Sequence, residues 1–547
     1  MTSIDTFAKD RLPAPADLPE FLFEGPGLQA PHRLNITHWL LDERVARGDG
    51  HRSCLIGADG TRWSYADLQR EVNRIAQVLV KDLGLIPGQR VLLRGANSPR
   101  LAACFLAVFK AGGIAVGTMP LLRAKELVAI IERAEITHAL CDARLAEELT
   151  LAQQQVKTLR TVLCFNGAAP DSAAGSVGKT LESCASTKSG VFTAFDSAAD
   201  DICLMAFTSG TTGQPKAAMH FHRDLWAACR CWPVHVLKAT ADDVFIGSPP
   251  LAFTFGLGGL LIFPLSIGAS AVLIEKASPD VLPLAVATHK ATVMFTAPTS
   301  YRAMAAPLDA KRGVDGLSSL RKCISAGEAL PAATRKLWKD ATGIEIIDGI
   351  GSTELFHIFI SADEAHAKPG ATGVPVPGYV AAILDGEGRP VEPGQVGRLA
   401  IKGPTGCKYL DDPRQSQYVQ HGWNLTGDAY LVDSEGQYVY QARTDDMIIS
   451  GGYNIAGPEV ESALMLHPAV AECGVVGVPD EERGQIVKAF VVLRPGNAAD
   501  EAMVQALQNF VKQTIAPYKY PRAVEFRASL PRTETGKLQR FRLRQGG

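Results

Sequence analysis

Apolar and polar positions alternate along the chain in two rhythms, one typical of strands and one typical of helices. After Ser64, apolar residues recur at helical spacing over residues 68–79, which predicts an amphipathic helix with this serine as its N-cap. A strand over 90–94 and a largely apolar helix over 100–111 are predicted next, and the alternation continues through Cys164. This order indicates an α/β fold in which helices cover a mostly parallel sheet.

The pattern changes twice in the last third of the chain. Over residues 379–442, short apolar strands are separated by turns rich in Asp and Gly, which predicts a β-rich subdomain. Beyond these strands, helices are predicted at 458–465 and 500–515, strands at 472–478 and 487–493, and then a polar tail. We therefore expect a large N-terminal domain of βα subdomains over residues 1–443 and a small α+β C-terminal domain over residues 444–547.

One long uncharged stretch tests whether the chain is soluble. No charged residue lies between Val244 and Ile274, and the length alone would allow a membrane span. Three prolines and five glycines interrupt this stretch, however, and no basic segment precedes it. We therefore expect a buried passage from strand through loop and helix to a second strand, near a functional site.

Length and composition are those of a soluble globular protein. The chain has 547 residues, 46% of them hydrophobic, and a net charge of −2. We expect about two to four domains, and no binding to nucleic acid or to an anionic membrane surface. Asp5 and Asp10 lie near the N-terminus and no long apolar core accompanies them, which predicts a cytoplasmic protein without a signal peptide.

Histidine and cysteine lie close together between His220 and Cys231, so a metal site has to be considered. Single-residue gaps separate His220 from His222 and Cys229 from Cys231, which is not the usual spacing of zinc ligands. The other cysteines are scattered. Buried free thiols in a reducing compartment are therefore a better interpretation than disulfides or a metal.

A loop rich in hydroxyl groups follows the strand predicted at residues 203–207. It reads Thr-Ser-Gly-Thr-Thr-Gly-Gln-Pro-Lys, and its spacing does not match the usual P-loop. Hydroxyl and backbone N–H donors suit the oxygens of a polyphosphate, glycine allows close approach, and lysine adds a positive charge. A polar surface turn is the alternative interpretation. The candidate phosphate-binding residues are Thr208, Ser209, Gly210, Thr211, Thr212, Gly213 and Lys216.

Further polar segments stand beside apolar strands. They are Ser325–Glu328, Asp348–Glu354, Thr426–Asp428, Arg443–Asp446 with Ser450–Gly452, and Pro531–Lys537. Each alone is a weak signal, because such segments are usually turns or solvated tails. Together with the hydroxyl-rich loop, in this order and spacing, they resemble the adenylate-forming superfamily of acyl-CoA synthetases, adenylation domains and firefly luciferase. The resemblance covers nearly the whole chain.

This resemblance implies a reaction in two steps. A carboxylate attacks the α-phosphate of ATP and expels pyrophosphate, and the thiol of CoA then displaces AMP. Glu354 would hold Mg²⁺ beside Thr353, whose hydroxyl would meet the α-phosphate, and Lys537 would be the catalytic lysine. The implied ribose and adenine contacts are Asp428, Arg443, Gly327, Glu328, Ala329, Asp348 and Gly349. The family usually places an aromatic residue where this chain has Ile350, so the adenine contact departs from the pattern.

The resemblance also implies that the C-terminal domain moves. Asp445 occupies the position of the family's hinge, about which the domain would swing between the two steps. One pose would present Lys537, and the other would bring Ser450, Gly451 and Gly452 beside a pantetheine channel. Ordinary turn glycines are the alternative. The surroundings of Lys537 also resemble the acetylation site of bacterial acyl-CoA synthetases, so a lysine acetyltransferase is a candidate partner.

The segment from Pro249 to Gly256 matches the part of the family that faces the acyl group. The expected acyl pocket consists of Phe253, Thr254, Phe255, Gly256, Ala326, Gly351, His357 and Ile358. Small residues and two phenylalanine rings predict a short, flat slot suited to an aromatic ring. Alternatively, the two phenylalanines are ordinary core residues.

Three passages bear on the choice of acid. Residues 351–359 and 450–459 resemble benzoate-type aryl-CoA ligases, and the second of these, with Met119–Leu122, resembles the 2-aminobenzoate-CoA ligase group. We therefore expect a 2-aminobenzoate-CoA ligase, with benzoate as the next candidate, acting as a monomer or homodimer. A free-standing enzyme that loads a carrier protein and a non-catalytic ligand-binding homologue are the alternatives.

Overall fold

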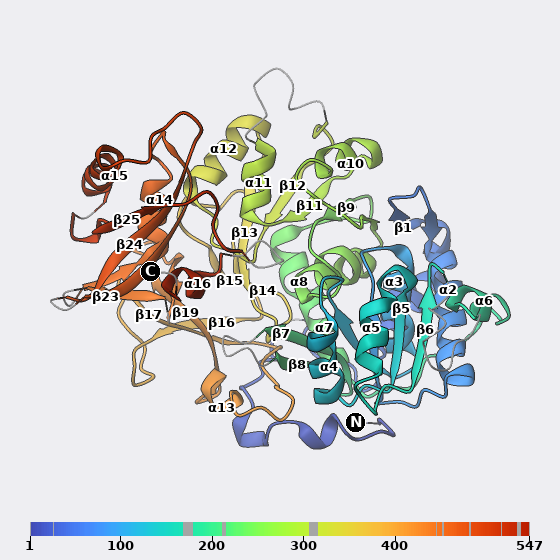
Figure 1. Ribbon diagram of the computed structural model, residues 1–547. Coiled ribbons are helices and arrows are strands. Elements are labelled where there is room, and N and C mark those ends of the chain that lie inside the picture. The colour runs from blue at the N-terminus through green and yellow to red at the C-terminus, as the bar shows by residue number, and fades with distance from the viewer. Residues whose placement is uncertain are drawn as a thin grey trace.

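The computed structural model describes residues 2–25, 27–167, 179–209, 215–305, 316–444, 446–450, 453–480, 483–515, 517–532 and 538–545. Its described strands form four β-sheets, two large ones in the N-terminal part and two smaller ones toward the C-terminus. In Figure 1 the C-terminal part, in orange and red, lies at the opposite side of the molecule from the blue and cyan N-terminal helices. The mixed α/β architecture predicted from the sequence is confirmed.

The first large sheet carries the hydroxyl-rich loop at one edge. Its strands run in the order β6 (Thr161–Phe165), β5 (His138–Asp142), β3 (Arg90–Arg94), β4 (Ile114–Thr118), β7 (Ile202–Ser209) and β8 (Pro215–Phe221). All neighbours are parallel except β7 and β8, which pair antiparallel with Thr208 opposite Lys216. The residues on either side of the loop, Thr208 and Lys216, therefore lie next to each other on paired strands.

The second large sheet has nine strands and is parallel in its centre. The strand order is β15 (Val374–Pro375), β14 (Ile358–Ser361), β13 (Ile346–Gly351), β12 (Lys322–Ser325), β11 (Val293–Thr296), β9 (Val244–Gly247), β10 (Ser270–Leu273), β1 (Ser53–Gly57) and β2 (Arg62–Ser64). The strands from β13 to β1 pair parallel, whereas the outer pairs are antiparallel. The polar segment at 325–328 begins at the end of β12, and the one at 348–354 begins within β13, where its parallel pairing with β12 stops.

Helices cover these sheets as the apolar periodicity predicts. They are α1 (Glu43–Ala46), α2 (Tyr65–Gln77), α3 (Pro99–Lys110), α4 (Ala124–Arg133), α5 (Ala146–Gln153), α6 (Leu181–Ser186), α7 (His222–Arg230), α10 (Leu282–His289), α11 (Pro298–Ala305) and α12 (Ala332–Thr342). The predicted cap of α2 is confirmed, because the Ser64 hydroxyl accepts from the Asp67 N–H and Asp67 bonds back to Ser64. Leu68, Val72 and Ile75 on its inner face are buried.

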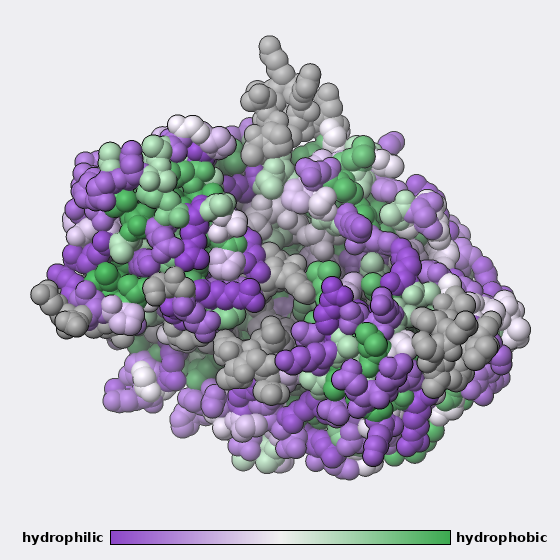
Figure 2. All heavy atoms as spheres, viewed as in Figure 1, coloured by the Kyte–Doolittle hydropathy of each residue, from purple (hydrophilic) through white to green (hydrophobic). Residues whose placement is uncertain are grey.

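The uncharged stretch at 244–274 is a buried passage, as predicted. Strand β9 leads through α8 (Thr254–Leu257), a π-helical turn (Gly258–Ile262) and α9 (Phe263–Ile267) into β10. Within the described residues, no helix is long and apolar enough to cross a bilayer. On the face drawn in Figure 2, hydrophilic residues predominate and hydrophobic ones form smaller interspersed patches.

The two smaller sheets follow the predicted change of pattern. The β-rich subdomain contains β16 (Val380–Leu384), β17 (Gly397–Lys402), β18 (Val419–Gln420), β19 (Trp423–Val432), β20 (Tyr438–Arg443) and α13 (Gln415–Tyr418). The last sheet contains β21 (Met447–Ser450), β22 (Tyr453–Ala456), β23 (Val470–Asp480), β24 (Gly484–Leu493) and β25 (Ala523–Phe526), with helices α14 (Gly457–Leu464), α15 (Glu501–Thr514) and α16 (Arg540–Gln545).

The predicted polar tail is wrong in part. Strand β25 pairs parallel with β24, and α16 follows it close to the C-terminus. Strand β25 has four residues and α16 has six, three of them arginine, so both elements carry little apolar periodicity. Leu530 and Leu543 are nevertheless buried against Val476 and Phe490 of the sheet. Packing against a preformed sheet, rather than local propensity, orders this segment.

Candidate active site

Three segments from distant parts of the chain meet at Lys216. The Lys216 Nζ donates to Glu354 Oε1 over 2.8 Å and also to the Tyr409 hydroxyl, which in turn donates to the same Oε1. Lys216 stands at the start of β8, Glu354 follows β13, and Tyr409 follows β17 in the β-rich subdomain. The Lys216 ammonium also lies 4.7 Å from the centre of the Tyr409 ring.

Burial and charge compete at this cluster. Only 6% of Glu354 is exposed, and burial by itself would raise the pKa of its carboxyl group. The Lys216 charge and the hydrogen bonds from Lys216 and Tyr409 outweigh burial and hold the pKa of Glu354 below its ordinary value. Burial, reinforced by the Glu354 charge, raises the pKa of the Tyr409 phenol, which therefore stays a donor. Glu354 is thus a buried, anionic carboxylate beside the Lys216 ammonium.

A second, fully buried set of charges lies behind this cluster. Lys408 and Asp224 form an ion pair of 2.8 Å in which neither side chain is exposed. His220, on β8, bonds through Nε2 to the carbonyl of Thr353 over 2.9 Å. The backbone N–H of Phe221 donates to Asp224. These contacts join β8, α7 and the turn that carries Thr353 into one rigid unit.

The predicted ribose contacts lie together on two paired strands. Asp428 of β19 and Arg443 of β20 are register partners, and the Arg443 Nη1 donates to Asp428 Oδ1 over 3.2 Å. The same nitrogen donates to the carbonyl of Thr426 over 3.1 Å. Asp428 is 9% exposed, so the arginine fixes a carboxylate that is within reach of a ligand.

The predicted adenine contacts lie at the ends of β12 and β13. Ser325 and Asp348 are register partners in these strands, and the Ser325 hydroxyl lies close enough to the Asp348 carboxyl to lower its pKa. Burial raises the pKa of Asp348 to about 7, although the Arg335 charge opposes the shift. A Cβ on Gly349 would lie 2.7 Å from the side chain of Ile358, so only glycine fits there. The predicted adenine residues thus lie side by side on two parallel strands.

The other adenine candidates lie on the loop after β12. Gly327 has a φ of +91°, which glycine adopts without strain, and Glu328 and Ala329 follow it. Glu328 Oε1 lies 3.9 Å from the Arg532 guanidinium, which belongs to the segment after β25. Arg302 of α11 also donates to the sulfur of Met465 over 3.4 Å. The C-terminal region therefore contacts the adenine side of the site.

The predicted acyl residue His357 lies in a cage of aromatic rings. Its ring centre is 4.5 Å from that of Phe263, 5.5 Å from Phe255 and 5.6 Å from Trp232. Burial lowers the pKa of His357 to about 3, so the imidazole is neutral at physiological pH. The Phe255 backbone bonds the His357 ring closely enough to oppose this shift, and the Trp232 Nε1 has no hydrogen-bond partner within the described residues. Buried polar atoms without partners are uncommon and mark a place for a ligand group.

The remaining acyl candidates surround this cage. A Cβ on Gly256 would lie 2.1 Å from the Pro250 carbonyl oxygen, and one on Gly351 would lie 2.6 Å from that of His357, so both positions require glycine. Ala326, Thr254 and Ile358 are buried, and Phe253 and Phe255 are partly buried. Phe255 also packs on Phe295 of the core, 5.6 Å between ring centres, which agrees in part with the alternative that it is a core residue.

Several predicted site residues lie outside the described part of the chain. They are Gly210, Thr211, Thr212, Gly213, Asp445, Gly451, Gly452 and Lys537. Thr208 and Ser209 end β7, and Ser450 ends β21. The structure thus brings together Lys216, Thr353 and Glu354, but leaves the expected catalytic lysine as a prediction.

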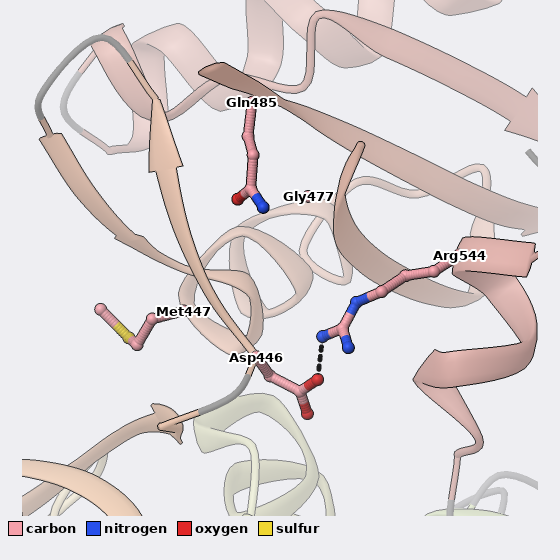
Figure 3. Close-up of a pocket in the computed structure, with 5 residues that line it drawn as sticks. All are labelled: Asp446, Met447, Gly477, Gln485 and Arg544. Atoms are coloured by element: carbon pink, nitrogen blue, oxygen red, sulfur yellow. Dashed lines mark hydrogen bonds and ion pairs between the residues drawn. The ribbon is translucent and has the colours of Figure 1, made fainter. Parts of the chain in front are cut away.

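A small cavity of about 140 Å³ adjoins the predicted hinge. Asp446 and Met447 line one side, and Gly477, Gln485 and Arg544 line the other. Figure 3 shows Arg544 reaching from α16 to an ion pair with Asp446. The last helix is therefore tied to the residue after the hinge position.

The sequence interpretation missed four residues that shape the site: His220, Trp232, Lys408 and Tyr409. His220 was considered only as a metal ligand, yet it bonds a backbone carbonyl. Tyr409 stands outside the polar segments that mark the predicted site residues, so nothing in the local sequence singles it out.

All eleven cysteines carry free thiols, and all but Cys184 are buried. Within the described residues, no group of three His, Cys, Asp or Glu side chains is placed to hold a metal.

Comparisons with known proteins agree with this geometry. A family model described as AMP-binding enzyme matches residues 42–409, and one described as AMP-binding enzyme C-terminal domain matches residues 459–537. A benzoate–CoA ligase from Thauera aromatica is 36% identical over 523 residues, which cover 95% of this chain and 97% of that protein.

Solved structures give the same result. The crystal structure of an anthranilate CoA ligase in complex with anthranoyl-AMP superposes with a TM-score of 0.88 at 35% identity, covering 94% of this chain and 98% of that one. A benzoate CoA ligase from Burkholderia xenovorans LB400 superposes with a TM-score of 0.84 at 31% identity, covering 93% and 100%. The chain therefore belongs to the AMP-binding enzyme family.

Proposed function

We propose that the protein is an ATP-dependent aryl-CoA ligase whose acid is 2-aminobenzoate, with benzoate as the next candidate. One observation carries this proposal. Glu354 and His357 belong to a single turn. Glu354 bonds Lys216, whose ammonium suits a polyphosphate, while His357 lies in an aromatic cage and can bond a polar group of a ligand. A nucleotide and an aromatic acid could therefore meet at the residues between them. The relatives named benzoate and anthranilate CoA ligases support the aryl class.

The phosphate end fits Mg²⁺·ATP. Glu354 is anionic, buried and beside a lysine, and carboxylate oxygens are ligands that Mg²⁺ prefers. Glu354 would hold the metal, which would neutralise charge on the phosphate oxygens. Lys216 and the loop from Thr208 to Gly213 would bind the β- and γ-phosphates. Thr353 would contact the α-phosphate.

In the first step, a carboxylate oxygen of the acid attacks the α-phosphorus. The bond from this phosphorus to the bridging oxygen of pyrophosphate breaks, which leaves the acyl-adenylate. Lys537 would donate to the carboxylate and to the bridging oxygen, where negative charge develops. Asp428 would accept hydrogen bonds from the ribose hydroxyls, and Arg443 would hold Asp428 in place.

In the second step, the CoA thiolate attacks the acyl carbon and AMP leaves with one of the carboxylate oxygens. The proton of the thiol is released. We propose that the domain after residue 443 turns about Asp445 between the steps, which would bring Ser450, Gly451 and Gly452 to the acyl end. The contacts of the C-terminal region with Glu328 and Arg302 would then break.

The choice of 2-aminobenzoate rests on His357. A neutral imidazole keeps one ring nitrogen as an acceptor even where the other donates to the Phe255 backbone, and this nitrogen can accept a hydrogen bond from an aromatic amino group. Thr254 is a second candidate acceptor. The solved anthranilate CoA ligase, which carries anthranoyl-AMP, supports the same acid.

The proposal is tested by product analysis on a panel of acids. Benzoate, 2-aminobenzoate, hydroxybenzoates and a mid-chain fatty acid are each incubated with ATP and Mg²⁺, with and without CoA. We expect pyrophosphate, AMP and the aroyl-CoA, with the highest kcat/KM for 2-aminobenzoate. Pyrophosphate release without CoA consumption would instead indicate a carrier-protein loader. No turnover on any acid would contradict the proposal.

A further inference from the structure

We propose that Tyr409 positions Glu354 for the metal, by holding one carboxylate oxygen so that the other faces the nucleotide. This inference rests on the proposed function, because it requires that Mg²⁺·ATP binds beside Glu354. Tyr409 would not touch the substrate. It would act through Glu354, and its effect would be on the metal rather than on the nucleotide itself.

The contacts around Glu354 support this role. Within the described residues, the side-chain hydrogen bonds to Glu354 both end on Oε1, one from Lys216 and one from Tyr409. Lys216 also donates to the Tyr409 oxygen. The three polar atoms thus form a closed triangle, and Oε2 is the carboxylate oxygen turned away from it.

Binding of a polyphosphate would separate Lys216 from Glu354 and Tyr409. Lys216 would turn to the phosphate oxygens, which carry more charge than one carboxylate. Glu354 is buried, and a buried carboxylate that loses its donors pays a desolvation cost. Tyr409 would remain as a hydrogen-bond donor to Glu354. Its hydroxyl would keep the carboxylate oriented after Lys216 has turned to the phosphates.

The protein holds Tyr409 more rigidly than a loop residue usually is. Tyr409 pairs with Ala218 on the open edge of β8, and backbone bonds on either side join Met219 to Lys408 and Leu410 to Ala217, at 2.8 and 3.0 Å. The buried pair of Lys408 and Asp224 anchors the same segment. Supporting groups of this kind fix ligand geometry when they stand on rigid elements.

A neighbouring tyrosine offers a matched control. The ring of Tyr418 packs on that of Tyr409 at 5.8 Å between centres, but its hydroxyl bonds Ser352 at 3.2 Å and not Glu354. Tyr409→Phe and Tyr418→Phe therefore each remove one hydroxyl from adjacent rings. Only the first removes a donor to the carboxylate.

The experiment measures binding instead of turnover. Calorimetry gives the dissociation constant of α,β-methylene-ATP with and without Mg²⁺ for the wild-type protein and both variants, after melting curves confirm that the variants fold. In the wild type, Mg²⁺ should tighten binding. In Tyr409→Phe this gain should fall about 10-fold or more, as for other groups that support a metal ligand. Binding without Mg²⁺ should not change, and Tyr418→Phe should match the wild type.

Other outcomes separate the two proposals. If Tyr409→Phe weakens binding equally with and without Mg²⁺, or keeps the full gain, the positioning role is wrong while the ligase proposal stands. If Tyr418→Phe loses the gain as well, the effect is not specific to Glu354 and the inference also fails. If the wild type binds no nucleotide, the proposed function fails first.

Discussion

Glu354 and His357 belong to the same turn and are both buried, yet their surroundings differ in kind. Glu354 has two donors, and the pKa of its carboxyl group is held down by Lys216. His357 lies among aromatic rings, with the Phe255 backbone as a polar neighbour. Around Glu354 the protein supplies the opposite charge, whereas around His357 burial keeps the imidazole neutral. A balanced charge and a neutral polar group are thus two ways to make a side chain compatible with burial.

The largest effect should come from removing the charge at the phosphate end. In Glu354→Gln, the protein would lose its metal ligand and the partner of Lys216. We expect ATP–pyrophosphate exchange to fall about 10²- to 10³-fold for every acid, because a charge that stabilises the transition state is lost. The ratio between benzoate and 2-aminobenzoate should stay constant. Glu435→Gln, at an exposed pair with Lys368, is the control, and near-normal exchange in Glu354→Gln would refute the role.

A smaller and more selective effect is expected at the acyl end. His357→Leu keeps the site apolar but removes the acceptor for an amino group. We expect kcat/KM for 2-aminobenzoate to fall about 10-fold relative to benzoate, which is the order of one lost hydrogen bond. His357→Asn should restore part of this preference. If the preference is lost in Thr254→Val and kept in His357→Leu, the threonine is the acceptor instead.

The smallest effect concerns stability at low pH. Burial lowers the pKa of His357 in the folded protein to about 3, below its unfolded value, so the unfolded chain binds more protons between these values. The stability of the folded state therefore falls as pH drops below about 6.5. His357→Leu should show a smaller loss of Tm between pH 7 and pH 5, by about 1–3 °C. An unchanged loss, measured by calorimetric melting, would show that His357 is not buried as neutral imidazole.

Much of the framework could be predicted from the sequence, because its signals are local. The Ser64 cap, the strand at 90–94 and the buried passage at 244–274 follow from periodicity and turn residues, and the structure confirms them. The strand and helix after residue 520 do not follow from the local pattern, since they are short and ordered by contacts with a distant sheet. The apolar pattern of the sequence predicts an element well where that element buries one continuous apolar face. It predicts poorly where a neighbouring element supplies most of the apolar contacts.

The site could be predicted only where residues stand in motifs. Lys216, Thr353, Glu354, Asp428 and Arg443 lie in polar segments beside strands, and the structure gives the contacts of each, while their roles toward a nucleotide stay predictions. Tyr409 and Trp232 carry no such mark. Tyr409 reaches the site because its segment pairs with the edge of β8. Trp232 follows α7 and packs on Phe263. Contacts of this kind depend on tertiary structure and have no local sequence signal.

The central claim is that both ends serve one adenylate-forming reaction. The most direct test uses benzoate or 2-aminobenzoate labelled with ¹⁸O in the carboxyl group, incubated with the protein, ATP, Mg²⁺ and CoA. If the carboxylate attacks the α-phosphorus, mass spectrometry will find one labelled oxygen in AMP and none in pyrophosphate. Unlabelled AMP, or formation of ADP with labelled phosphate, would contradict the account.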